Sequence, residues 1–197
     1  QMAERMIENG EVRSYPKWRT KSVERTIEEV KLLYYKYKKH FMVFVDDSWN
    51  VNQSWNEEFS ERLLKENMKL GWFAFMRADL ILRDEKAGIF KKLVDSGLSH
   101  ISIGVERADN TDLKDMGKNC YSQDMIRECM YILKHKYPQV FRQATFIVGI
   151  RNETKESILN QVQYAKEIDA DYPGFHPMTP VPGTEAWREA KEKGWLE

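Results

Sequence analysis

The stretch ISIGVERAD, residues 101–109, decides how the fold of this chain is interpreted. Its first residues are apolar or small, as in a buried strand, and the run then passes Gly104 and reaches the charged Glu106. A buried strand that ends on a carboxylate is typical of parallel α/β folds, in which sites lie at the carboxyl ends of the strands. The rest of the chain therefore has to be searched for other strands that end in the same way.

Composition excludes several classes of protein. The chain has 197 residues, enough for one domain with a sizeable core. Its 31 basic and 31 acidic residues give a formal net charge of zero, which argues against nucleic acid as the main partner, because phosphate binding favours a basic excess. No apolar run approaches the length of a membrane span, and the opening QMAERMIENGEV lacks the apolar core of a secretory signal. We expect a cytoplasmic protein with no membrane span.

The cysteines and histidines form no pattern of metal ligands. Cys120 and Cys129 have neither the spacing of a CxxC site nor the number needed for a disulfide framework, so we interpret them as ordinary thiols of a reduced compartment. The histidines show no HxxxH or HExxH spacing, and each is expected to be structural.

Helical and extended segments alternate along the chain. Apolar spacing predicts helices over residues 21–40, 54–70, 83–97, 122–137, 154–168 and 183–194. Apolar runs predict strands over residues 41–47, 71–79, 99–106, 141–150 and 172–180. Ser22, Ser54 and Thr154 are the expected helix N-caps, and Gly97 is expected to close the third helix. Such alternation predicts βαβ units and a parallel sheet.

Polar or small residues follow each predicted strand. They are Asp46 with Asp47, Arg77 with Asp79, Glu106, Gly149 with Arg151 and Glu153, and Thr179. Most of the steps between them are close to the ~30 residues of one βα unit. Any one of these charges could be a solvated loop residue, but several at one rim favour a site for a polar ligand. Gly104 and Gly149 would let that ligand approach the backbone closely.

Five motifs carry a resemblance to a known family. They are FVDDSW (44–49), RADL (77–80), HISIGVE (100–106), TFIVGIRNET (145–154) and TPVPGTE (179–185). In this order they resemble the radical S-adenosylmethionine (radical SAM) superfamily. More narrowly, the chain resembles the cobalamin-dependent branch that includes the anaerobic magnesium-protoporphyrin IX monomethyl ester oxidative cyclase. The resemblance runs from about Arg19 to Glu197.

The resemblance implies a partial TIM-like (β/α)6 parallel barrel, of which this chain would supply strands two to six, so that residues 1–197 form one radical SAM barrel domain. It implies an oxidoreductase in which a 4Fe–4S cluster and S-adenosylmethionine yield a 5′-deoxyadenosyl radical. The superfamily's CxxxCxxC cluster loop is absent from this sequence. We therefore expect a fragment, inactive by itself, with the cluster ligands and any cobalamin domain outside it.

Site residues are carried over by the same resemblance, which assigns no catalytic side chain and no metal ligand to this chain. Asp46 and Asp47 would contact the amino group of the methionine moiety, and Arg77 its carboxylate. Glu106 would contact the ribose hydroxyls, since a carboxylate can accept two hydrogen bonds from a diol. Ile147 and Gly149 would lie against adenine, and Glu153 completes the set of cofactor-binding residues.

Plainer structural readings of three of these residues stay open. Asp47 could be a helix N-cap acid beside Ser48. Glu106 could form a salt bridge with Arg77 or Arg107. Gly149 could serve only the exit of its strand.

Partners follow from the resemblance as well. It implies a small-molecule substrate of the tetrapyrrole type, which aromatic residues such as Trp49, Tyr172 and Phe175 could line unless they only pack, and an electron donor such as flavodoxin or ferredoxin. An exposed sheet edge would favour a homodimer. Two other functions stay open: a TIM-like hydrolase or aldolase that uses Asp46, Glu106 and a lysine, and a non-catalytic half-barrel interaction module.

Overall fold

The computed structural model describes residues 6–8, 11–13, 20–116, 121–151 and 153–195. Cys120 lies outside the described residues. The chain divides into two compact units, Gln1–Lys39 and His40–Glu197. Nothing in this division tests the assignment of residues 1–197 to one domain, which stays a prediction.

The N-terminal unit holds a short hairpin and a helix. Strands β1 (Met6–Glu8) and β2 (Glu11–Arg13), which the sequence pattern did not predict, pair antiparallel. Helix α1 (Val23–Lys31) begins at the predicted cap, where the side chain of Ser22 accepts a hydrogen bond from the backbone N–H of Arg25. A short π-helix, η1 (Leu32–Lys36), follows, so the helix predicted over residues 21–40 continues in a different form and ends earlier.

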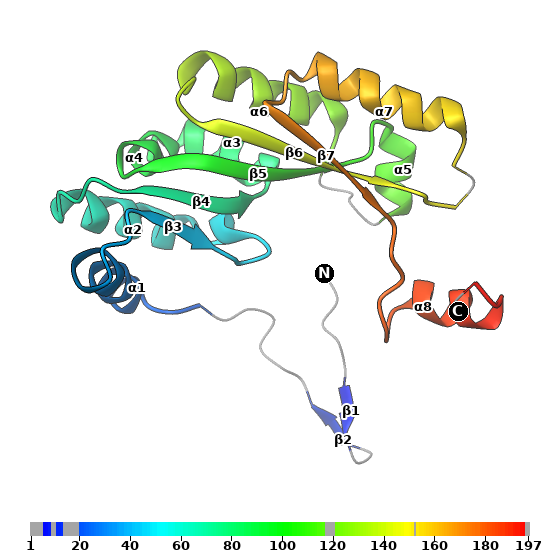
Figure 1. Cartoon of the computed structure of the whole chain (residues 1–197), viewed down its shortest axis with the longest axis horizontal. Helices are drawn as coiled ribbons and strands as arrows, with labels where there is room; N and C mark the ends of the chain where they lie inside the picture. Colours follow the sequence, from blue (N-terminus) through cyan, green and yellow to red (C-terminus); the bar gives the residue numbers. More distant parts are fainter. Residues whose placement is uncertain (1–5, 9–10, 14–19, 117–120, 152, 196–197) are drawn as a thin grey trace. The chain divides into compact units, whose positions relative to one another are not determined.

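The larger unit is built on five parallel strands. They are β3 (Phe41–Phe44), β4 (Gly71–Met76), β5 (Leu98–Glu106), β6 (Phe141–Val148) and β7 (Tyr172–Pro177). Their order in the sheet is their order in the chain, and each neighbouring pair is parallel (Figure 1). The prediction of an α/β fold with a parallel sheet of the TIM-like kind is confirmed.

Helices connect these strands. They are α2 (Gln53–Lys65), α3 (Ala78–Lys86), α4 (Ile89–Asp95), α5 (Asn110–Asp115), α6 (Gln123–Lys136) and α7 (Lys155–Glu167). A 3-10 turn, η2 (Trp49–Val51), precedes α2, and helix α8 (Glu185–Glu192) follows the last strand. Figure 1 shows α3, α6 and α7 along the same side of the sheet. None of the described helices is both long enough and apolar enough to cross a membrane.

Two helix predictions are wrong in detail. The segment predicted as one helix over residues 83–97 is two helices, because Gly88 adopts φ +73° between α3 and α4. The N-cap of α2 is Asn52, whose side chain accepts from the N–H of Trp55, and not Ser54. Thr154 does cap α7, and Gly97 follows α4 with φ +108°, as predicted.

The core lies between the sheet and these helices. Its largest fully buried side chains on the sheet are Trp72, Leu98, Ile101, Ile103 and Phe146. Trp49 belongs to this core: it is 6% exposed and its ring lies 4.9 Å from that of Trp72. The packing interpretation of Trp49 therefore holds, whereas Tyr172 and Phe175 remain partly exposed on β7.

Strand residues that alternate with this buried set form the other face of the sheet, which we call the open face. Several of its apolar side chains are exposed, with Val43 at 56% and Phe75 at 38%. It also carries polar groups, including His100, whose Nε2 lies 3.3 Å from Oε1 of Gln143. The open face thus presents exposed apolar side chains together with some polar groups.

Candidate functional site

The carboxyl ends of the five strands meet at one edge of the sheet. The last paired residues are Phe44 with Ala74, Met76 with Ile103, Glu106 with Phe146, and Val148 with Pro177. The predicted site residues Asp46, Asp47, Arg77, Glu106 and Gly149 stand at or just beyond these ends. The parallel sheet therefore brings residues from four strands to the same edge.

Asp46 and Asp47 lie in the segment that follows β3. Both are exposed. Ser48 is the N-cap residue of η2, and no side chain caps that turn by a hydrogen bond. The two carboxylates are therefore presented to solvent at the strand edge.

Arg77 directly follows β4 and is the N-cap residue of α3. Its guanidinium forms a two-point pair with Asp79, with Nε 3.0 Å from Oδ1 and Nη2 2.6 Å from Oδ2. Its backbone is held by Asn50, a buried residue that the sequence analysis did not identify. The signal was weak, because Asn50 is only one of three polar residues in the loop SWNVN (48–52) after β3.

Glu106 ends β5 in an unusual conformation. Its φ is +66°, and the register between β5 and β6 shifts between Gly104 and Glu106. A Cβ placed on Gly104 would lie 2.6 Å from Oε1 of Glu106, so the carboxylate lies over Gly104. The space beside Gly104, which we expected a ligand to use, is taken by this carboxylate.

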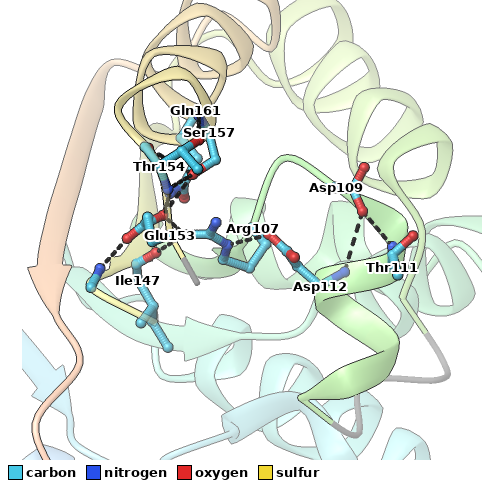
Figure 2. A network of polar contacts seen from close by, with 10 residues as sticks. Arg107, Asp109, Thr111, Asp112, Ile147, Glu153, Thr154, Ser157 and Gln161 are labelled. Carbon is cyan, nitrogen blue, oxygen red and sulfur yellow. Dashed lines mark hydrogen bonds and ion pairs between the residues drawn. The ribbon is translucent and has the colours of Figure 1, made fainter. Parts of the chain in front are cut away.

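Arg107 is the centre of a buried polar network (Figure 2). The residue is 1% exposed. Its Nε donates to Oδ2 of Asp112 at 2.8 Å, and its Nη1 donates to the carbonyl of Ile147 at 2.8 Å and to Oε1 of Glu153. One guanidinium therefore connects the end of β5, the start of α5 and the exit of β6.

Glu153 is held in this network by several donors. The backbone N–H of Gly149, Nε2 of Gln161 at 3.2 Å and Oγ of Ser157 at 3.4 Å all donate to its carboxylate. Burial raises the pKa of Glu153, but the hydrogen bonds from Arg107 and Gly149 outweigh burial and hold the pKa below its ordinary value. These contacts organise the loop after β6, and a direct contact of Glu153 with a cofactor stays a prediction.

The described residues do not fit an iron–sulfur cluster. Among them, no group of three or more His, Cys, Asp or Glu side chains is placed to hold a metal ion. Cys129 is buried in α6, and burial raises the pKa of its thiol, which disfavours the thiolate that binds iron. Any cluster ligands would have to come from other residues.

No protein-family profile matches the chain. It is 31% identical over 174 residues to an uncharacterized methyltransferase of Pyrococcus horikoshii, an alignment that covers 88% of this chain and 36% of that protein. It is 27% identical over 177 residues to the anaerobic magnesium-protoporphyrin IX monomethyl ester cyclase of Rubrivivax gelatinosus, covering 89% of this chain and 31% of the cyclase. The chain thus spans about a third of the length of these relatives.

The fold resembles that of a solved structure, coproporphyrinogen III oxidase of Escherichia coli, described as a radical SAM enzyme. The TM-score is 0.57 at 15% identity, over 71% of this chain and 32% of the oxidase. At this identity the likeness shows the fold alone. Together with the cyclase relative, it confirms the resemblance to the radical SAM superfamily that the motifs predicted.

Proposed function

We propose that this chain, with the fold and the relatives of the radical SAM superfamily, supplies the surface that binds S-adenosylmethionine in a radical SAM enzyme. The observation that carries the proposal is the carboxylate of Glu106. Glu106 is the last residue of β5, at the carboxyl ends of the strands, where the resemblance to the superfamily predicts the ribose. Its carboxylate lies over Gly104 and does not point away from the sheet.

The residues at this edge fit such a ligand by their chemistry. The exposed carboxylates of Asp46 and Asp47 suit the amino group of the methionine moiety. Arg77, fixed by its pair with Asp79, suits the carboxylate. A carboxylate such as that of Glu106 can accept two hydrogen bonds from the ribose diol. The backbone from Ile147 to Gly149, held by Arg107 and Glu153, suits the adenine edge.

The complete enzyme that we propose is an oxidoreductase resembling magnesium-protoporphyrin monomethyl ester cyclase. A 4Fe–4S cluster held by residues outside this sequence would supply radical generation from S-adenosylmethionine, and cobalamin would be bound by a further domain. The residues of this chain bind and orient, since positioning rather than proton transfer is their contribution. The apolar open face suits a tetrapyrrole, and a flavodoxin or ferredoxin would supply the electron.

The test uses the full-length protein, reconstituted anaerobically with iron and sulfide and reduced with dithionite. We expect 5′-deoxyadenosine to form from S-adenosylmethionine, and to fall at least about tenfold in Glu106→Ala, because one charge-assisted hydrogen-bonding group is lost. Glu156→Ala, which removes an exposed carboxylate of α7, is the matched control and should leave the product unchanged.

Two results would count against the proposal. If Glu106→Ala formed as much 5′-deoxyadenosine as the wild type, Glu106 would not be a ribose-binding residue. No product from a protein with a full cluster would favour a hydrolase, an aldolase or an interaction module that keeps the half-barrel without the radical chemistry.

A further inference from the structure

We infer that Arg107 is a positioning residue that holds the two adenosine-contacting segments of the proposed site in one arrangement. The inference rests on the proposed function, because it concerns how the residues assigned to ribose and adenine are held. Arg107 itself is buried beneath the edge and would not touch the ligand.

The first segment is the turn that carries Glu106. The backbone N–H of Arg107 donates to the carbonyl of Val105 at 2.8 Å, which closes a three-residue turn with Glu106 at its centre. With φ at +66°, this is the rare and strained form of that turn. Such a strained conformation persists only where the surrounding structure enforces it.

The side chain of Arg107 holds this turn in place at one end. Its guanidinium is held by Asp112 and by Glu153. The pair with Glu153 is shielded from solvent, with 2% of the arginine side chain and 5% of the Glu153 side chain exposed, whereas 29% of the Asp112 side chain is exposed. Because a buried guanidinium is costly to leave unpaired, Arg107 is fixed relative to these partners. Glu106, the residue before Arg107, is therefore held at the centre of the three-residue turn.

The second segment is the exit of β6. Arg107 donates to the carbonyl of Ile147, and its partner Glu153 accepts from the N–H of Gly149. Ile147 and Gly149 are the residues assigned to adenine. The same guanidinium thus sets the separation between the ribose carboxylate on one strand and the adenine backbone on the next. Preorganisation of this kind lowers the cost of ordering the site when the ligand binds.

The chain offers a matched control in Arg142. It is also a buried arginine, 8% exposed, and its guanidinium forms a two-point pair with Asp171 at 2.9 and 2.8 Å. Arg142 lies near the start of β6, however, at the amino edge of the sheet. Its loss should cost comparable stability without touching the strand edge that carries Glu106.

The experiment measures binding of S-adenosylhomocysteine by calorimetry to the reconstituted full-length protein, with thermal melting as a check of folding. We expect Arg107→Met to raise the Kd at least about tenfold and Arg142→Met to leave it unchanged. In the double variant Glu106→Ala/Arg107→Met, the loss of binding free energy should be smaller than the sum of the two single losses, because part of the effect of Arg107 acts through Glu106. If Arg107→Met does not fold, Arg107→Lys, which keeps the charge but not the planar fork, replaces it.

The outcomes separate this inference from the proposed function. A wild-type protein that does not bind S-adenosylhomocysteine contradicts the proposed function itself. Binding by the wild type together with an unchanged Kd in a folded Arg107 variant contradicts only the positioning role. An equal rise in Kd in the Arg107 and Arg142 variants, or strictly additive losses in the double variant, would show a general structural role and would overturn the inference.

Discussion

The side-chain amide of Asn50 pairs with both backbone polar groups of Arg77. Its Oδ1 accepts from the N–H of Arg77 at 3.1 Å, and its Nδ2 donates to the carbonyl of Arg77 at 3.2 Å. The carbonyl of Asn50 in turn accepts from Nδ2 of Asn56 and from Nη2 of Arg83 at 2.8 Å. The loop after β3 and the end of β4 are therefore joined as one unit at the strand edge that carries Asp46 and Arg77.

Asn50→Ala should destabilise the protein by about 1–3 kcal/mol, because at this buried position it removes the acceptor for the N–H of Arg77 and one of the two donors to the Arg77 carbonyl, which keeps the N–H of Ile81. Urea unfolding at neutral pH measures the change. Asn160→Ala, at an exposed position of α7, is the control and should stay within about 0.5 kcal/mol of the wild type. A loss of similar size in both variants would mean that Asn50 has no special part in this unit.

Gly104→Ala tests the placement of the Glu106 carboxylate. The new Cβ would lie 2.6 Å from Oε1 of Glu106, and the carboxylate, as the far end of a side chain, can move aside. We therefore expect a small change in stability but a Kd for S-adenosylhomocysteine raised roughly tenfold, since the ribose carboxylate is displaced.

Gly174→Ala is the matched control for that change, because Gly174 lies on β7 and a Cβ there would first meet Nε2 of His176 at 3.1 Å. It should leave the Kd near the wild-type value. Equal effects of the two substitutions on the Kd would contradict the assignment of the ribose to Glu106.

A pair of glycines at the helix ends tests the fold independently of any ligand. Gly97 and Gly88 both have positive φ, so alanine at either position should cost about 1 kcal/mol from the backbone alone. At Gly97 a Cβ would also lie 2.3 Å from the carbonyl oxygen of Leu70, whereas at Gly88 nothing lies within 4 Å. Urea unfolding should therefore show Gly97→Ala to be clearly the more destabilising variant. If Gly97→Ala lost no more stability than Gly88→Ala, the close approach of the end of α4 to the loop before β4 would be contradicted.

The sequence predicted the features that depend on neighbouring residues. Ser22 and Thr154 cap their helices as expected, because a cap involves residues only two or three positions apart. The five strands were found because apolar runs between helical segments are a local signal. Asn52 was missed as the cap of α2 because Ser54 also fits the pattern, and only the fold decides between them.

The network of Arg107 could not be predicted in this way. Its contact with Glu153 joins residues 46 positions apart, and both residues look like ordinary rim charges in the sequence. Only the pairing of β5 with β6 brings them together and shields their side chains from solvent. The sequence therefore predicted which strand ends carry polar groups, but not which of these groups face a ligand and which hold the others in place.

The pH dependence of stability should report the state of Glu153. Because the folded protein holds the pKa of Glu153 below the ordinary value of 4.5, the folded state favours the carboxylate. This stabilisation is present above about pH 4.5 and is lost as the pH falls below that value through the lowered pKa of the folded state. Glu153→Gln cannot ionise, so the stability difference between the wild type and this variant should be constant near neutral pH and should shrink on acidification.

Urea unfolding of both proteins between about pH 3 and 7 measures that difference. Other carboxylates with lowered pKa values, such as Asp109 and Asp171, titrate in both proteins and cancel in the comparison. Glu156→Gln, at an exposed site, controls for the loss of one negative charge and should stay within about 0.5 kcal/mol of the wild type at neutral pH. A difference between the wild type and Glu153→Gln that grows on acidification would have the wrong sign. It would mean that the burial of Glu153 outweighs the hydrogen bonds that its carboxylate accepts from Arg107 and Gly149.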